Sequence, residues 1–212
     1  MSSTLCPLPF THQHIEPSGE IKFCCAAVYN SNKDSQDRTF NVTTHKLSDA
    51  WNSEYYKQLR LDLIAGNEPE ACRECWKKEN KDHSGGASVR INSLERIPAD
   101  TYLDRVDYAT KNNGALDVKP FDFQVMAGNL CNLACKMCGP TYSTGYSKFF
   151  KNAGYQKIQD VKFSLLTQKG PDDDDLGTKY DWPVTYPLKN IFNEYYDSLT
   201  NIYITGGEPT LL

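Results

Sequence analysis

The chain has 212 residues, which at roughly 150 residues per domain allows one domain, or one domain with a small appendage. It carries 23 Lys and Arg residues against 27 Asp and Glu residues, a formal charge of −4, and the basic side chains are scattered. No apolar stretch approaches the roughly 20 residues that a membrane span needs, and no basic stripe favours a nucleic-acid backbone. We therefore expect neither a membrane nor a nucleic acid as a partner.

The N-terminal segment is predicted to form a hairpin followed by two helices. A Pro-Ser-Gly turn separates short apolar–polar alternations over residues 15–23, which is typical of a β-hairpin. His12 and His14 alternate on its first arm, which favours surface or packing roles over metal ligation. With Ser48 as N-cap, large apolar residues recur every fourth position up to Gly66 and predict a helix. A short helix after Pro69 is expected to carry Cys72 and Cys75 on one face.

The C-terminal segment is predicted to alternate strands and helices. Alternating apolar residues over 121–125 predict a strand that runs into Gly128. Helical spacing follows Pro140 up to residue 154, and a further amphipathic helix is expected over 188–199. A short apolar strand over 202–205 then ends in two glycines. Strand, helix and strand in this order predict a parallel sheet, whereas residues 83–119 give no clear pattern.

Eight cysteines are the unusual feature of the composition. The first residues, MSSTLCPLPFTHQH, lack the charged-then-apolar pattern of a secretory signal, so we expect a cytoplasmic location and reduced thiols. Regularly spaced cysteines in such a chain favour metal binding over disulfides. Five lie in the first 75 residues and three lie together further on, which predicts two separate sites.

The later group, Cys131, Cys135 and Cys138, forms a CxxxCxxC motif on the loop after the first strand of the parallel pair. Three thiolates from one loop can hold three corners of an iron–sulfur cube, which normally takes four cysteines, and so leave one iron open to a small molecule. A zinc site completed by a distant ligand, or three buried structural thiols, are the alternatives. The GGEP segment at 206–209 ends the next strand on the same rim of the sheet, where parallel folds bind ligands.

Together, CxxxCxxC and GGEP resemble the signature of radical S-adenosylmethionine (SAM) enzymes. The resemblance implies a 4Fe–4S cluster whose open iron chelates SAM, held by Cys131, Cys135 and Cys138. In the family, the reduced cluster cleaves SAM to a 5′-deoxyadenosyl radical that abstracts a substrate hydrogen. The resemblance also implies a set of SAM-contacting positions, namely Gly206, Gly207, Glu208 and Pro209 in the turn and Met137 beside the adenine. It names no further catalytic residue.

The earlier group has four candidate ligands, Cys6, Cys24, Cys72 and Cys75. As two pairs they could form a zinc ribbon. Their layout around the hairpin also resembles the auxiliary-cluster domains of radical SAM proteins. The SPASM type has further cysteines that are missing here, so the shorter twitch type, with one 4Fe–4S cluster, is expected. Spacing from the turn glycine favours Cys24 over Cys25 as the ligand.

The predicted fold class is α/β. The resemblance implies the first two βα units of a partial (β/α)6 radical SAM barrel, preceded by a small α+β cysteine-rich auxiliary domain. We place the auxiliary domain at residues 1–85, a linker at 86–118 and the incomplete radical SAM domain at 119–212. Two parallel strands alone would leave a bare edge, so the sequence is expected to be the N-terminal part of a longer enzyme or one half of a split one.

The predicted function is a radical SAM enzyme, or a fragment of one, that acts on a peptide, a protein or a small molecule. Its implied partners are a reductant such as flavodoxin or ferredoxin and a second chain that completes the barrel. The 212-residue chain alone is expected not to turn over SAM. The alternative is a non-catalytic iron–sulfur or zinc scaffold, or an electron carrier.

Overall fold

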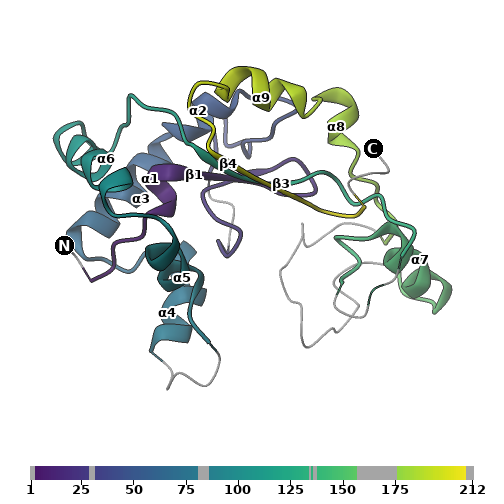
Figure 1. Ribbon diagram of the computed structural model, residues 1–212. Coiled ribbons are helices and arrows are strands. Elements are labelled where there is room, and N and C mark those ends of the chain that lie inside the picture. The colour runs from purple at the N-terminus through teal and green to yellow at the C-terminus, as the bar shows by residue number, and fades with distance from the viewer. Residues whose placement is uncertain are drawn as a thin grey trace.

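Four strands form one mixed sheet, in the order β2-β1-β3-β4, within the residues that the computed structural model describes: 3–28, 32–80, 86–133, 135, 138–156 and 176–208 (Figure 1). Strand β1 (His12–Ile15) pairs antiparallel with β2 (Ile21–Lys22) and parallel with β3 (Asp122–Met126). Strand β3 pairs parallel with β4 (Asn201–Thr205). The hairpin and the parallel β3–β4 pair confirm the sequence prediction. The expected two-stranded sheet was wrong, because β1 extends it beyond β3.

One face of the sheet is covered by helices that follow the strands in the chain. Phe123 and Val125 of β3 are fully buried there, against Ile191 and Tyr195 of α9 (Lys189–Tyr195). Helix α8 (Trp182–Thr185) and helix α2 (Leu47–Trp51) contribute to the same core. Figure 1 shows α2 and α9 above the sheet. Phe123 and Val125, two of the alternating apolar residues of the predicted strand 121–125, therefore point to the sheet face that these helices cover.

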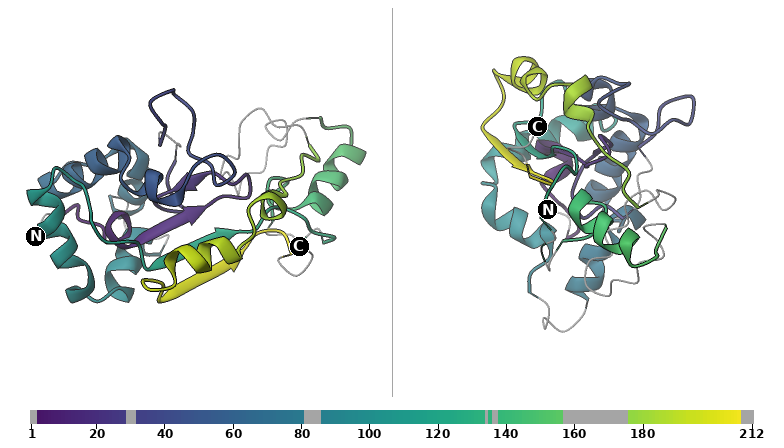
Figure 2. Two further views of the ribbon diagram at one scale, coloured as in Figure 1. Left: turned by 90° about the horizontal axis from the view of Figure 1, so that it is seen from above. Right: turned by 90° about the vertical axis from the view of Figure 1, so that its right-hand side faces the viewer.

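A second hydrophobic core lies at the amino ends of the parallel strands. It joins three helices, α1 (Leu8–Thr11), α3 (Glu54–Ala65) and α6 (Asp100–Lys111). The 3-10 helix Glu70–Cys72 and helix α4 (Arg73–Glu79) add buried residues to the same core, and helix α5 (Val89–Arg96) packs against it. Figure 2 shows the same separation from above, with these helices at one end of the sheet and α7 (Thr144–Asn152) at the other.

The helix predicted after Ser48 is divided in two. Helix α2 ends at Trp51 and α3 begins at Glu54, and Ser53 caps α3 by accepting a bond from the backbone N–H of Tyr56. The break is held by Asn52, whose side chain bonds both the N–H and the carbonyl of Leu116. Gly66 ends α3 in the left-handed conformation, as predicted.

Two helices, α5 and α6, lie in the segment 83–119, for which no clear pattern was found in the sequence. Helix α7 begins at Thr144, because residues 139–142 form a turn and Ser143 caps the helix. None of the helices in the described ranges combines the length and the apolar character needed to cross a membrane.

Candidate metal centres

The CxxxCxxC loop leaves β3 and folds back onto the start of α7. The backbone N–H of Cys131 donates to Thr144 Oγ1 at 3.1 Å, and the carbonyl of Cys131 accepts from the N–H of Gly145 at 2.9 Å. Within the loop, the N–H of Cys138 donates to the carbonyl of Cys135 at 2.8 Å. The N–H of Leu133 donates to Cys131 Sγ at 3.4 Å, a kind of bond that helps to set the potential of iron–sulfur clusters.

The turn that begins GGEP lies directly against this loop. Gly207 N–H donates to the carbonyl of Gly128 at 3.2 Å, and Glu208 N–H donates to the carbonyl of Leu130 at 2.6 Å. A Cβ atom on Gly207 would lie 2.2 Å from the carbonyl oxygen of Leu130, closer than real Cβ contacts come. Gly206 has φ +103°, a conformation that favours glycine. The two glycines are therefore required for two backbone segments to meet at the strand ends.

The three thiols of the loop differ in exposure. Cys135 is exposed, whereas Cys131 and Cys138 are half-buried, and burial raises the pKa of Cys138. Two of the residues implied in SAM binding, Met137 and Pro209, lie outside the described residues. The other three, Gly206, Gly207 and Glu208, lie against the start of the loop that carries the three thiols.

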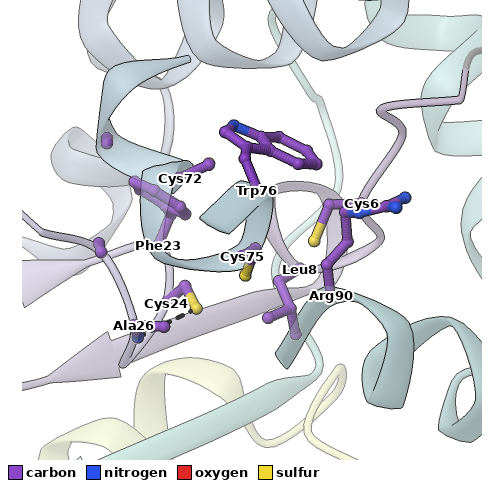
Figure 3. Close-up of a pocket in the computed structure, with 11 residues that line it drawn as sticks. Cys6, Leu8, Phe23, Cys24, Ala26, Cys72, Cys75, Trp76 and Arg90 are labelled. Carbon is purple, nitrogen blue, oxygen red and sulfur yellow. Dashed lines mark hydrogen bonds between the residues drawn. The ribbon is translucent and has the colours of Figure 1, made fainter. Parts of the chain in front are cut away.

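The earlier cysteines line one cavity although they come from separate parts of the chain (Figure 3). Cys6 precedes α1, Cys24 follows β2, and Cys72 and Cys75 lie at the junction of the 3-10 helix with α4. The rest of the wall is apolar, with Leu8, Phe23, Ala26, Ala27, Ala71 and Trp76, except for Arg90. Four thiols around one cavity are the donor set that a 4Fe–4S cluster takes.

Burial dominates the electrostatics of this cavity. It raises the pKa of Cys6 to about 12, and it also raises the pKa of Cys72 and of Cys75. The pKa of Cys24 is raised by its hydrogen bond with Cys25 and by burial. Neutral thiols are thus favoured until a metal supplies positive charge, so metal binding here would release protons.

The structure distinguishes Cys24 from its neighbour. Cys24 lines the cavity, and its Sγ accepts a bond from the N–H of Ala26 at 3.3 Å. Cys25 does not line the cavity, and it interacts electrostatically with His14 and Glu16 of the hairpin. The spacing from the turn glycine favours the same residue, and Cys24 as the ligand stays a prediction.

The hairpin histidines are buried in the sheet. His12 Nδ1 bonds Asp122 Oδ2 at 3.1 Å, and Asp122 also accepts from Arg96 and Asn201. His14 is fully buried, with Nε2 at 3.4 Å from Glu16 Oε1. Both therefore have packing roles. In the part of the chain that the structure describes, no three Cys, His, Asp or Glu side chains are gathered tightly enough for one metal ion.

Sequence reasoning missed the charged group at the wall of the cavity. Arg90, at the start of α5, is 9% exposed and pairs with Glu79 at the end of α4. The only available signal was Ser88, a typical N-cap residue that accepts from the N–H of Ile91. Neither the pairing nor its place beside the cysteines follows from local periodicity.

A comparison with known protein families gives a match for the N-terminal region. Residues 6–76 match the family described as SPASM, an iron–sulfur cluster-binding domain, and all four cysteines of the cavity lie within the match. Domains of this kind occur in radical SAM enzymes. No curated protein and no solved structure matched the chain. The family match thus supports iron–sulfur cluster binding by the N-terminal region, and the choice of the shorter twitch form stays a prediction.

Proposed function

We propose that the chain is a radical SAM enzyme, or the N-terminal part of one, with an auxiliary 4Fe–4S cluster. The observation that carries the proposal is the contact between the GGE turn and the CxxxCxxC loop at the carboxyl ends of β3 and β4. Ligands of parallel sheets bind at this edge. A cluster on Cys131, Cys135 and Cys138 would then lie next to the turn.

The residues of the loop and the turn have distinct parts in this proposal. The three thiolates hold three irons and leave the fourth open, and the Leu133 N–H stabilises the Cys131 thiolate. The close packing of Gly206 and Gly207 on residues 126–130 fixes the turn, whose backbone would receive the SAM amino group. Bound there, the cluster would supply one electron for reductive cleavage of SAM.

The auxiliary cluster is assigned to Cys6, Cys24, Cys72 and Cys75. With four thiolates its irons are fully ligated, which favours an electron-transfer or structural role over substrate binding. The support is the family match together with the single cavity that all four residues line. Cys25, which does not line the cavity, is left without a ligand role.

The partners follow from the chemistry. A low-potential donor such as flavodoxin or ferredoxin would reduce the clusters, and this requirement suits a cytoplasmic location. We favour a peptide or protein substrate, with a small molecule as the other candidate. Strand β4 ends the sheet on one side within the described residues, and further parallel strands, from the same chain or from a second one, would complete the barrel there.

Anaerobic reconstitution tests the proposal. The unaltered chain should bind about eight iron and eight sulfide ions, whereas alanine at 131, 135 and 138 should halve both numbers. Cys24→Ala should also lose a cluster, and Cys25→Ala is its matched control. In Mössbauer spectra, added SAM should alter one iron of the unaltered chain and none in the triple variant. A colourless protein with bound zinc, or spectra that do not respond to SAM, would refute the proposal.

A further inference from the structure

One residue in the wall of the auxiliary cavity, Arg90, lies outside the matched residues 6–76 and forms an ion pair with Glu79. Arg90 Nε lies 3.1 Å from each carboxylate oxygen of Glu79, and Nη2 also bonds this carboxylate. The Ser88 hydroxyl donates to the same carboxylate at 2.5 Å. The pair joins the end of α4, which carries Cys75, to the start of α5.

The guanidinium is held in place from three directions. Its Nη1 donates to the carbonyls of Ser3 and Leu5, each at 3.1 Å, and Leu5 directly precedes Cys6. Its Cζ lies 5.2 Å from the centre of the Trp76 ring. Figure 3 shows the Arg90 side chain alongside Cys6 at the cavity. Because the side chain is nearly buried and its donors are engaged, its charge has a fixed position next to the thiols.

A fixed cation at this point has a predictable effect on a cluster. Arg90 interacts electrostatically with Cys6, Cys72 and Cys75. A cluster with four thiolates is net negative, and one-electron reduction makes it more negative. Nearby positive charge therefore favours the reduced form, and screening by water is weak at a buried site.

We propose that Arg90 is the counter-charge of the auxiliary cluster, and that it raises the potential at which this cluster accepts an electron. Glu79 holds the guanidinium in place and offsets part of its charge. Glu79 and Arg90 thereby become part of the cluster site although they follow the matched domain. This inference rests on the proposed auxiliary cluster, but it does not depend on SAM chemistry.

The test isolates the auxiliary cluster in the full chain with alanine at 131, 135 and 138. A chemical reductant supplies the electron, and the signal of the reduced cluster in electron paramagnetic resonance gives its potential. Arg90→Met should shift the potential to lower values, whereas Arg90→Lys, which keeps the charge, should stay close to the potential of the parent chain. Glu79→Gln should shift the potential upward. Arg38→Met, an exposed arginine that also pairs with an acid, is the matched control and should cause no shift.

Opposite shifts distinguish a charge effect from a structural one, because two disruptive changes would not move the potential in opposite directions. If Arg90→Met fails to take up iron, the Glu79→Gln variant alone tests the charge effect: an upward shift in potential supports it, and no shift or a downward shift overturns it. Equal potentials in all loaded variants, or shifts of the same sign, would overturn the role of Arg90 alone. Failure of the parent chain to bind four irons would instead overturn the auxiliary cluster itself.

Discussion

Substitution of Gly207 by alanine is the sharpest test of the contact between the two motifs. The added methyl group would lie 2.2 Å from the carbonyl oxygen of Leu130 and 2.6 Å from the carbonyl carbon of Asn129. Both are backbone atoms, so they cannot move aside as the end of a flexible side chain can. The turn and the cysteine loop must therefore separate.

The size of the effect follows from this overlap. Overpacking of this kind costs about 1–3 kcal/mol, which in a chain of this length corresponds to a fall of roughly 2–12 °C in the unfolding temperature. We expect Gly207→Ala to show such a fall and to lose the SAM-dependent change in the Mössbauer spectrum. The iron content of the auxiliary site should stay unchanged.

Gly139→Ala provides the matched control on the same loop. A Cβ atom there would meet nothing closer than Tyr142 Cδ2 at 3.9 Å, an ordinary contact. Thermal unfolding of the metal-free protein, followed by reconstitution, compares the two variants. Equal stability and equal SAM response in both would refute the conclusion that close packing of the turn on the loop builds the site.

Three further predictions concern stability. Arg60→Met should lower the free energy of unfolding by about 2–4 kcal/mol in urea titrations, because the fully buried guanidinium donates to three backbone carbonyls that would lose their partner. Ser53→Ala should cost about 1 kcal/mol in the same assay, because it removes the N-cap of α3. Burial acts to raise the pKa of Glu16, but its bonds to His14 and Lys22 outweigh burial and lower the pKa from 4.5 to about 2. The native state thus binds fewer protons than the unfolded state, so stability should fall as the pH drops from about 4.5 to 2, and Glu16→Gln should remove this part of the urea-midpoint dependence on pH.

Local patterns were sufficient for the parallel strands and for the motifs at their ends. The apolar alternation before Gly128 and the short apolar run before Gly206 each place a strand correctly. The spacing of the glycines and cysteines in the two motifs can be interpreted chemically from the sequence alone. Their meeting at one rim follows from the parallel pairing alone.

Long-range pairing accounts for most of what the sequence could not predict. Strand β1 contains His12, Gln13 and His14, and all three polar side chains are buried, whereas the local pattern left surface and packing roles open for the two histidines. Their burial depends on β3, which lies 110 positions further along the chain, through pairs such as His12 with Asp122. No periodicity within a few residues contains this information.

The position of β1 also bears on how the two cysteine sites are related. The hairpin leads from Cys6 to Cys24, and its first strand is hydrogen-bonded to β3, which leads into the CxxxCxxC loop. Tyr142, just after this loop, interacts electrostatically with Glu16 and Cys25 of the N-terminal region and with Cys138. The two groups of cysteines are therefore connected through adjacent, hydrogen-bonded strands of one sheet. If both proposed clusters form, this shared sheet would hold them at a constant distance, which suits the proposed relay role better than that of an independent module.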